Sequence, residues 1–132
     1  MHTKVIAIPK DFTAQLTINL LRKLKPSSEE SYHLYIIDEK NRLSGVLSIR
    51  SLLTADPKIS VTKIMKKQVV KVKIDAKKDE IANALAKYGL YTLPVVDQNN
   101  ILKGIVKADD VLTEIMPESW KKRIFMAKGY KK

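Results

Sequence analysis

Lysines are the residues best placed to do chemistry in this 132-residue chain, because they crowd two stretches and give a formal net charge of +11. One stretch lies in the middle of the chain and the other near its C-terminus: Lys63, Lys66, Lys67, Lys71, Lys73, Lys77 and Lys78, then Lys121, Lys122, Arg123, Lys128, Lys131 and Lys132. Such a field attracts phosphates, nucleic acid, anionic lipid or an acidic protein surface. Lysines also solvate exposed faces, so the charge alone identifies no partner.

The residue types that perform catalysis are scarce. The chain has no cysteine and two separated histidines, His2 and His33, so thiolate chemistry is excluded and acid–base chemistry lacks an obvious pair. Neither a P-loop nor a Gly-x-Gly-x-x-Gly sequence occurs. We therefore expect a protein that is not an enzyme and needs no cofactor.

The composition, 45% hydrophobic and 30% charged, is typical of a soluble globular protein. No apolar run approaches the roughly 18–20 residues that a membrane-spanning helix needs. The apolar stretch at the N-terminus is too short for a signal peptide. These features predict a cytoplasmic location, with membrane association through a partner or a segment outside this sequence as the alternative.

An internal repeat organises the elements that must position any site. Residues 35–47 match residues 93–106 at a fixed offset, which pairs Asp38 with Asp97 and Gly45 with Gly104. Each copy predicts a β-hairpin with a polar turn, followed by a helix. The glycine in the second strand indicates a bulge or a close approach of another backbone segment.

A strand and a helix are expected before each hairpin. The strands lie at 5–8 and 69–74, and the helices carry Leu16, Leu20, Leu21 and Leu24 in the first copy and Ile81, Leu85 and Tyr88, ending at Gly89, in the second. Each unit is therefore β-α-β-β-α. A unit this small cannot bury both faces of its sheet, so we expect a pseudo-symmetric α/β (α+β) pair at residues 1–57 and 58–116, with a basic tail at 117–132.

The pattern resembles the CBS domain, which occurs as tandem pairs. The resemblance rests on Leu93-Pro94-Val95-Val96-Asp97 and on Gly104-Ile105-Val106-Lys107-Ala108-Asp109-Asp110, both in register with the repeat. Residues 35–57, which begin Tyr35-Ile36-Ile37-Asp38-Glu39, are similar to the first CBS domain of MgtE-type magnesium transporters. The resemblance implies a homodimeric regulatory module on the cytosolic side of a transporter, able to bind ATP, ADP or AMP. Neither the N-terminal domain nor the channel of those transporters is present in this chain.

The resemblance also implies nucleotide-binding residues in a cleft between the repeats. In the family motif Gly-apolar-x-Ser/Thr-x-x-Asp, the carboxylate accepts the ribose hydroxyls and the hydroxyl residue meets phosphate. The first copy has Ser48 and a phosphate-pairing candidate, Arg50, but Ser51 replaces the ribose-binding Asp. The second copy keeps Asp110, while Lys107 replaces the hydroxyl.

Other readings of these residues stay open. The pattern favours Ser48 as a helix N-cap, and Asp110 serves equally as a favourable charge at a helix start. His33 and Leu90 stand where MgtE-type modules place aromatic contacts to adenine, and Pro94 completes the candidate nucleotide site. His33 is also an ordinary strand residue.

Magnesium sensing has less support, because hard cations need clustered carboxylates. Lys77 and Gly89 occupy positions that are acidic in MgtE-type modules, and seven lysines lie between Lys63 and Lys78. We expect weak or no magnesium binding by this chain and no resident metal.

Two functions follow. The first is a non-catalytic module that senses an adenosine nucleotide as the regulatory part of a divalent-cation transporter. The alternative is a basic interaction module that binds nucleic acid or another polyanion, although interleaved stacking aromatics are lacking.

In the tail, Trp120 and Ile124 share one helical face, which suits a docking helix or packing back on the core.

Overall fold

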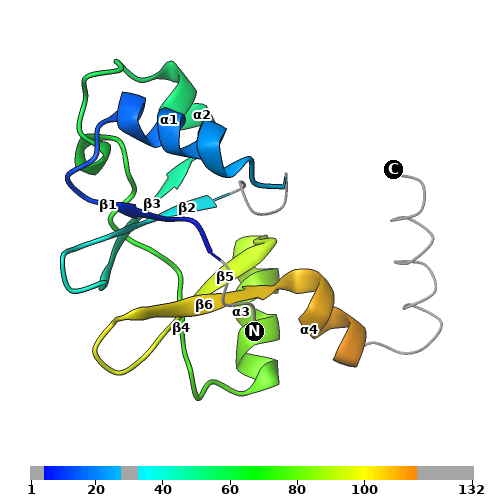
Figure 1. Ribbon diagram of the computed structural model, residues 1–132. Coiled ribbons are helices and arrows are strands. Elements are labelled where there is room, and N and C mark those ends of the chain that lie inside the picture. The colour runs from blue at the N-terminus through cyan, green and yellow to red at the C-terminus, as the bar shows by residue number, and fades with distance from the viewer. Residues whose placement is uncertain (1–4, 28–32, 116–132) are drawn as a thin grey trace, which may run out of the picture.

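The computed structural model describes residues 5–27 and 33–115. Within these ranges the chain builds two units, one above the other in Figure 1. The first contains β1 (Ala7–Pro9), α1 (Ala14–Leu24), β2 (His33–Ile37), β3 (Leu43–Ser48) and α2 (Ile49–Thr54). The second contains β4 (Val72–Lys73), α3 (Lys78–Tyr88), β5 (Thr92–Val96), β6 (Leu102–Lys107) and α4 (Ala108–Ile115). The predicted order of elements and the mixed α/β fold class are confirmed.

Each unit has its own three-stranded sheet, with the orders β1-β2-β3 and β4-β5-β6. The first strand runs parallel to the second, and the second runs antiparallel to the third. In the first unit α1 and α2 lie on the side of the sheet that faces away from the second unit (Figure 1). The two sheets therefore face each other across the middle of the molecule.

Local signals set the ends of the long helices. The Thr13 hydroxyl accepts a hydrogen bond from the Leu16 amide at 3.2 Å, which caps α1, and Lys25 ends that helix with a left-handed backbone. Gly89 ends α3 at φ 60°, where glycine carries no steric penalty. Gly89 as the helix stop is therefore confirmed.

The buried face of α1 differs from the leucine pattern. Ala14 and Thr17 are its fully buried residues, whereas Leu16 and Leu24 are 49% and 54% exposed. Thr17 tolerates burial because its hydroxyl donates to the Thr13 carbonyl at 2.9 Å. Leucine spacing thus predicts the helix correctly but assigns too many leucines to the core.

The two hairpins share one turn chemistry. Asp38 Oδ1 accepts the amides of Lys40 and Arg42, both at 2.9 Å, and Asp97 Oδ1 accepts those of Asn99 and Ile101 at 2.8 and 3.0 Å. Asn41 and Asn100 take left-handed conformations at φ 64° and 66° in the equivalent places. Each hairpin then shifts register just before its glycine, as the sequence indicates.

The two hairpin turns also bind each other across the units. The Leu43 amide donates to the Asn100 carbonyl at 2.9 Å, and the Leu102 amide donates to the Asn41 carbonyl at 3.1 Å. The Asn100 side-chain amide adds a bond to the Leu43 carbonyl at 2.9 Å. This reciprocal pairing joins the units at the turn end of both hairpins.

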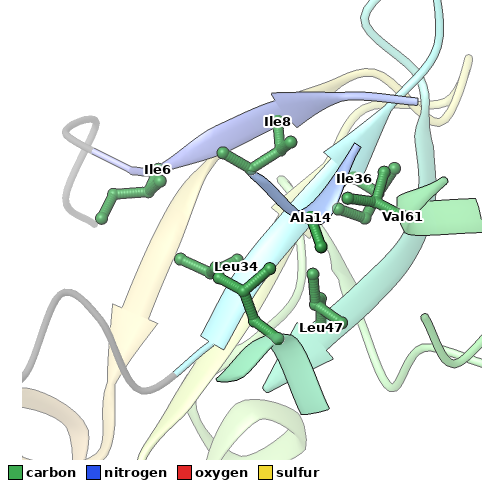
Figure 2. Close-up of a cluster of buried hydrophobic side chains, with 8 residues drawn as sticks. Ile6, Ile8, Ala14, Leu34, Ile36, Leu47 and Val61 are labelled. Carbon is green, nitrogen blue, oxygen red and sulfur yellow. The ribbon is translucent and has the colours of Figure 1, made fainter. Parts of the chain in front are cut away.

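Three apolar clusters hold the fold. Figure 2 shows the first, where side chains from β1, β2 and β3 meet Ala14 of α1 and Val61. A second cluster packs α3 against the other sheet around Leu85 and Leu93. The third joins the two units through Tyr35, Leu43, Val96 and Ile105. The units therefore share a core between them.

The segment after α2 returns to the first unit before the second begins. The Ala14 amide donates to the Ile59 carbonyl at 2.8 Å, and the Val61 amide donates to the Phe12 carbonyl at 3.0 Å. Val61, in the short 3₁₀ helix Val61–Lys63, is fully buried in the first cluster. This segment therefore packs as part of the first unit.

Candidate functional site

A cleft of about 400 Å³ opens between the two units, near the strand ends opposite the hairpin turns. The first unit and the connecting segment supply His33, Tyr35, Val46, Ser48, Ser51, Ile64, Lys66, Gln68, Val69 and Val70. The second unit supplies Tyr88, Leu90, Thr92 and Pro94. Apolar side chains with a few polar groups, in a hollow of this size, are typical of a small-molecule site.

Strand register places the polar residues of the first unit together. His33 pairs with Ser48, and Tyr35 pairs with Val46, across β2 and β3. Paired residues on neighbouring strands project from the same face of a sheet, so these four side chains line one wall.

The connecting segment closes the cleft against β3. The Val46 amide donates to the Lys66 carbonyl at 3.0 Å, and the Lys66 amide donates to the Val46 carbonyl at 2.8 Å. This pairing needs Gly45, because a Cβ there would lie 2.9 Å from the Lys66 carbonyl oxygen and would overlap Met65. The expected close backbone approach at this glycine is confirmed.

Ser48 and Ser51 bind each other at the start of α2. Ser48 Oγ accepts the Ser51 amide at 3.1 Å and donates to Ser51 Oγ at 3.0 Å. Ser48 is thus the N-cap of α2, which confirms that reading of the residue. Both hydroxyls still line the cleft, where they can meet a polar ligand.

A second polar pair crosses between the units. The Tyr35 hydroxyl lies 3.2 Å from Thr92 Oγ1, and both side chains are buried. Burial raises the pKa of Tyr35 above its ordinary value, despite the opposing effect of the bond to Thr92. The phenol therefore stays neutral and ties β2 to β5 at the base of the cleft.

His33 lacks such a partner. Among the buried side-chain nitrogen and oxygen atoms of the described residues, its Nδ1 is the one without a hydrogen bond. Burial, and secondarily the positive charge of Lys66, hold the pKa of His33 below its ordinary value of 6.5. The imidazole is therefore neutral at pH 7.

The charge of the cleft favours an anion. Its lining includes one lysine, Lys66, and no Asp or Glu. Across residues 5–27 and 33–115, no group of three His, Cys, Asp or Glu side chains is arranged to hold a metal ion. The lining of the cleft is thus mainly apolar and also includes hydroxyl groups, one imidazole and one lysine ammonium group.

Four of the seven predicted nucleotide-binding residues meet in this cleft: His33, Ser48, Leu90 and Pro94. Arg50 is exposed on α2 and is not part of the lining.

The two predicted motif residues of the second repeat, Lys107 and Asp110, are not part of this lining. Lys107 pairs with Thr92 at the end of β6, outside the lining. Asp110 borders a separate hollow of about 200 Å³ together with Lys73 and Lys78. Of the predicted set, four residues therefore line the cleft, Asp110 borders the smaller hollow, and Arg50 and Lys107 line neither.

Sequence reasoning did not identify Tyr35, Thr92 and Lys66 as cleft residues. Strand alternation places Tyr35 on the same face as His33, so that signal was available in the sequence. Lys66 reaches the cleft only through its backbone pairing with Val46, a tertiary contact that no local pattern reveals.

Two further predictions concern the membrane and the tail. In the part of the chain that the structure describes, every helix is too short or too polar to span a bilayer. The tail at 117–132, with Trp120 and Ile124, lies outside the described residues.

Comparison with known proteins places this geometry among related modules. The magnesium transporter MgtE of Thermus thermophilus is 40% identical over 119 residues, 90% of this chain and 26% of the transporter. The MgtE protein of Bacillus subtilis is 30% identical over the same shares. This chain therefore spans about a quarter of the length of these relatives.

A solved structure agrees with the fold. The cytosolic domain of the Mg²⁺ channel MgtE in complex with ATP matches with a TM-score of 0.80 and 41% identity, over 86% of this chain and 46% of that one. The CBS domain family matches twice, at residues 1–58 and 61–117. Together with the repeated fold, these matches show that the chain belongs to the CBS domain family and carries two copies of the domain.

Proposed function

We propose that this CBS pair is a regulatory module that binds an adenosine nucleotide in the cleft around Ser48. The observation that carries the proposal is the cleft itself, an apolar hollow of about 400 Å³ with hydroxyls and one lysine in its wall. The apolar walls suit a purine, and Lys66 with the two serines suits ribose and phosphate. A matched structure at 41% identity is described as a complex with ATP, which supports this ligand class.

We further propose that the module regulates a divalent-cation transporter on its cytoplasmic side. The support is the 40% identity to a magnesium transporter over 90% of this chain. In this arrangement the nucleotide biases how the two repeats and two copies of the chain pack. That effect requires the ligand to bind the alternative arrangements with different affinity.

Isothermal titration calorimetry with a panel of compounds tests which class of ligand the protein binds. AMP, ADP, ATP, MgCl₂ and a short single-stranded RNA are titrated into the protein at two salt concentrations. We expect saturable nucleotide binding with modest salt dependence and a weak magnesium signal. Steeply salt-dependent RNA binding without any nucleotide binding would instead support the polyanion function, for which the lysine-rich segment is the favouring observation.

A pair of matched variants tests the location. Leu90→Trp fills the cleft, whereas Leu24→Trp makes the same change at the end of α1, at a side chain that is 54% exposed and outside the lining. Nucleotide binding should be lost in the first variant and kept in the second, with both proteins folded by circular dichroism. Equal binding by both variants would place the ligand elsewhere.

A further inference from the structure

The hollow of about 200 Å³ that Asp110 borders lies between the second sheet and the helices α3 and α4. Its apolar lining has counterparts in the first unit, because the repeat offset and the equal lengths of α1 and α3 align the two units. The equivalent pairs are Ile81 and Thr17, Val95 and Ile36, Val106 and Leu47, and Val111 and Leu52. In the first unit, the cluster that contains Ile36, Leu47 and Leu52 is completed by Val61, which is fully buried (Figure 2).

The lining of the hollow is less well covered than its counterpart. Val106 is 8% exposed and Leu47 is 1% exposed, and Ile81 is half-buried where Thr17 is fully buried. Ile74 at the rim is 53% exposed. Among the described residues, the hollow therefore marks the place that Val61 fills in the first unit.

The internal repeat supplies a residue for this place. The offset that pairs Asp38 with Asp97 also pairs Val61 with Trp120. In the first unit, the residues that follow α2 return to the start of α1, where the Ala14 amide binds the Ile59 carbonyl. The tail, residues 117–132, follows α4 in the same way in the sequence. Trp120 therefore stands at the right distance along the chain.

The size of the lining residues favours a side chain larger than valine. The three valines of the hollow each have one carbon fewer than the isoleucine or leucine at the equivalent place in the first unit. Protein interiors are close-packed, so three missing methylene groups leave space that a second Val61 would not fill. An indole ring suits such a space, provided that its N–H finds an acceptor. The carboxylate of Asp110 at the rim can accept that bond.

We propose that the hollow is the docking site of this chain's own tail, with Trp120 in the place that Val61 takes in the first unit. Docking covers the three valines and completes the core of the second unit. It also fixes the point on α3 and α4 from which the residues after Trp120 leave the module. This inference does not depend on a ligand in the cleft.

Trp120 is the single tryptophan of the chain, so its fluorescence reports the docking directly. In the wild-type protein its emission should lie at short wavelength, and acrylamide should quench it weakly. Ile81→Glu places a charge in the lining, whereas Asn83→Glu places the same charge at an exposed position of α3. The first variant should shift the emission to longer wavelength and increase the quenching, because an apolar ring is not buried against a charge. The second should change neither, with both variants folded by circular dichroism.

A pair of engineered cysteines tests the position of the tail. Thr13, the N-cap of α1, forms an antiparallel bridge with Ser60, and the equivalent residues are Lys77, the N-cap of α3, and Ser119. The chain has no cysteine of its own. A mild oxidant should therefore join Lys77→Cys to Ser119→Cys within one chain, since bridge partners lie within the reach of a disulfide. The control pair, Lys40→Cys with Ser119→Cys, uses an exposed turn of the first unit and should stay reduced.

Non-reducing gels and mass spectrometry distinguish a crosslink within one chain from one between two chains. A crosslink between chains would assign the hollow to the tail of a second copy and would overturn the inference. Long-wavelength emission in the wild type, or no disulfide between positions 77 and 119, would leave the hollow to another occupant and would overturn it as well. Short-wavelength emission that Ile81→Glu does not change would show that Trp120 packs elsewhere, which is again contrary to the inference.

Discussion

At the scale of the residue, Ser51 and Asp110 hold equivalent places in the two repeats, but they differ in chemistry and position. Ser51 lines the cleft, whereas Asp110 borders a smaller separate hollow. The family motif has a carboxylate at this place, where it accepts both hydroxyls of a ribose. The cleft therefore has an apolar lining for the base but lacks the carboxylate that would bind the ribose.

Restoring the carboxylate should strengthen ribose binding. Ser51→Asp is expected to tighten AMP binding about tenfold, because hydrogen bonds to a charged acceptor contribute roughly 1.5–3 kcal/mol. The amide of residue 51 can still bind Ser48, so the helix cap survives. Calorimetry with AMP and with adenine distinguishes the ribose contribution, since adenine affinity should not change.

Asp110→Ala is the matched change in the other repeat. It should leave AMP affinity unaltered if the nucleotide occupies the cleft around Ser48. Loss of AMP binding in Asp110→Ala, with no gain in Ser51→Asp, would move the site to the second repeat.

Local chemistry explains which site residues the sequence could predict. Ser48 was predictable as a cap, and strand pairing keeps His33 next to it. Tyr35 and Thr92 required knowledge of how the sheets face each other, because their hydrogen bond joins residues far apart in the chain. Long-range pairs of this kind leave no periodic signal.

At the scale of the element, each hairpin turn depends on one aspartate. Asp97 accepts two backbone amides, and Lys103 Nζ lies 3.9 Å from its second oxygen. The hydrogen bond from the Ile101 amide is the main cause that lowers the pKa of Asp97 below its ordinary value of 3.8, against the opposing effect of desolvation. The turn therefore binds the charged form of this carboxyl.

The stability supplied by Asp97 should depend on pH. A lowered folded-state pKa means that the contribution is complete above the ordinary value and is lost as pH falls through the folded-state value. Asp97→Asn keeps an acceptor oxygen but no charge. The difference in unfolding free energy between wild type and Asp97→Asn should therefore be constant from pH 7 to 5 and shrink below pH 4. Urea unfolding at four pH values measures it, and a difference independent of pH would contradict this role.

Element prediction succeeded where the signals are local. Both hairpins, the helices α1 to α4 and the stop at Gly89 follow from turn residues and apolar spacing. The strand expected at 69–74 is shorter, since β4 covers Val72–Lys73, and the preceding residues line the cleft instead. Apolar residues that face a cavity look the same in sequence as residues of a strand.

At the scale of the whole molecule, two exposed leucines lie on the neighbouring helices α1 and α2. Leu16 on α1 and Leu53 on α2 are 49% and 68% exposed, and the two helices lie side by side in Figure 1. Apolar side chains on neighbouring helices favour association. We propose this face as the contact of a homodimer.

Sedimentation velocity tests the dimer. Wild type should sediment as a dimer at micromolar concentration, and Leu53→Glu should shift the population toward monomer because it places a charge in an apolar contact. Thr54→Glu adds the same charge at the next position along α2 and serves as the control. A monomeric wild type, or two variants with equal effect, would contradict this contact.

The pairing of two like units was the strongest prediction at this scale, because the internal repeat is visible in the chain itself. The packing of residues 59–66 was not predictable. Those residues follow the first repeat in sequence and pack back against it through Phe12 and Val46.

The reciprocal bonds between the hairpin turns have a mechanical consequence. Leu43 and Leu102 join the two units at the turn end, and the Tyr35–Thr92 pair joins them at the base of the cleft, so relative movement of the units is least constrained at the open end. A ligand that wedges into the open end then changes an angle rather than a separation. Displacements of one unit relative to the other then grow with distance from the end where the hairpin turns bind each other. If the module regulates a transporter, as proposed, this change of angle would transmit the binding of the ligand to it.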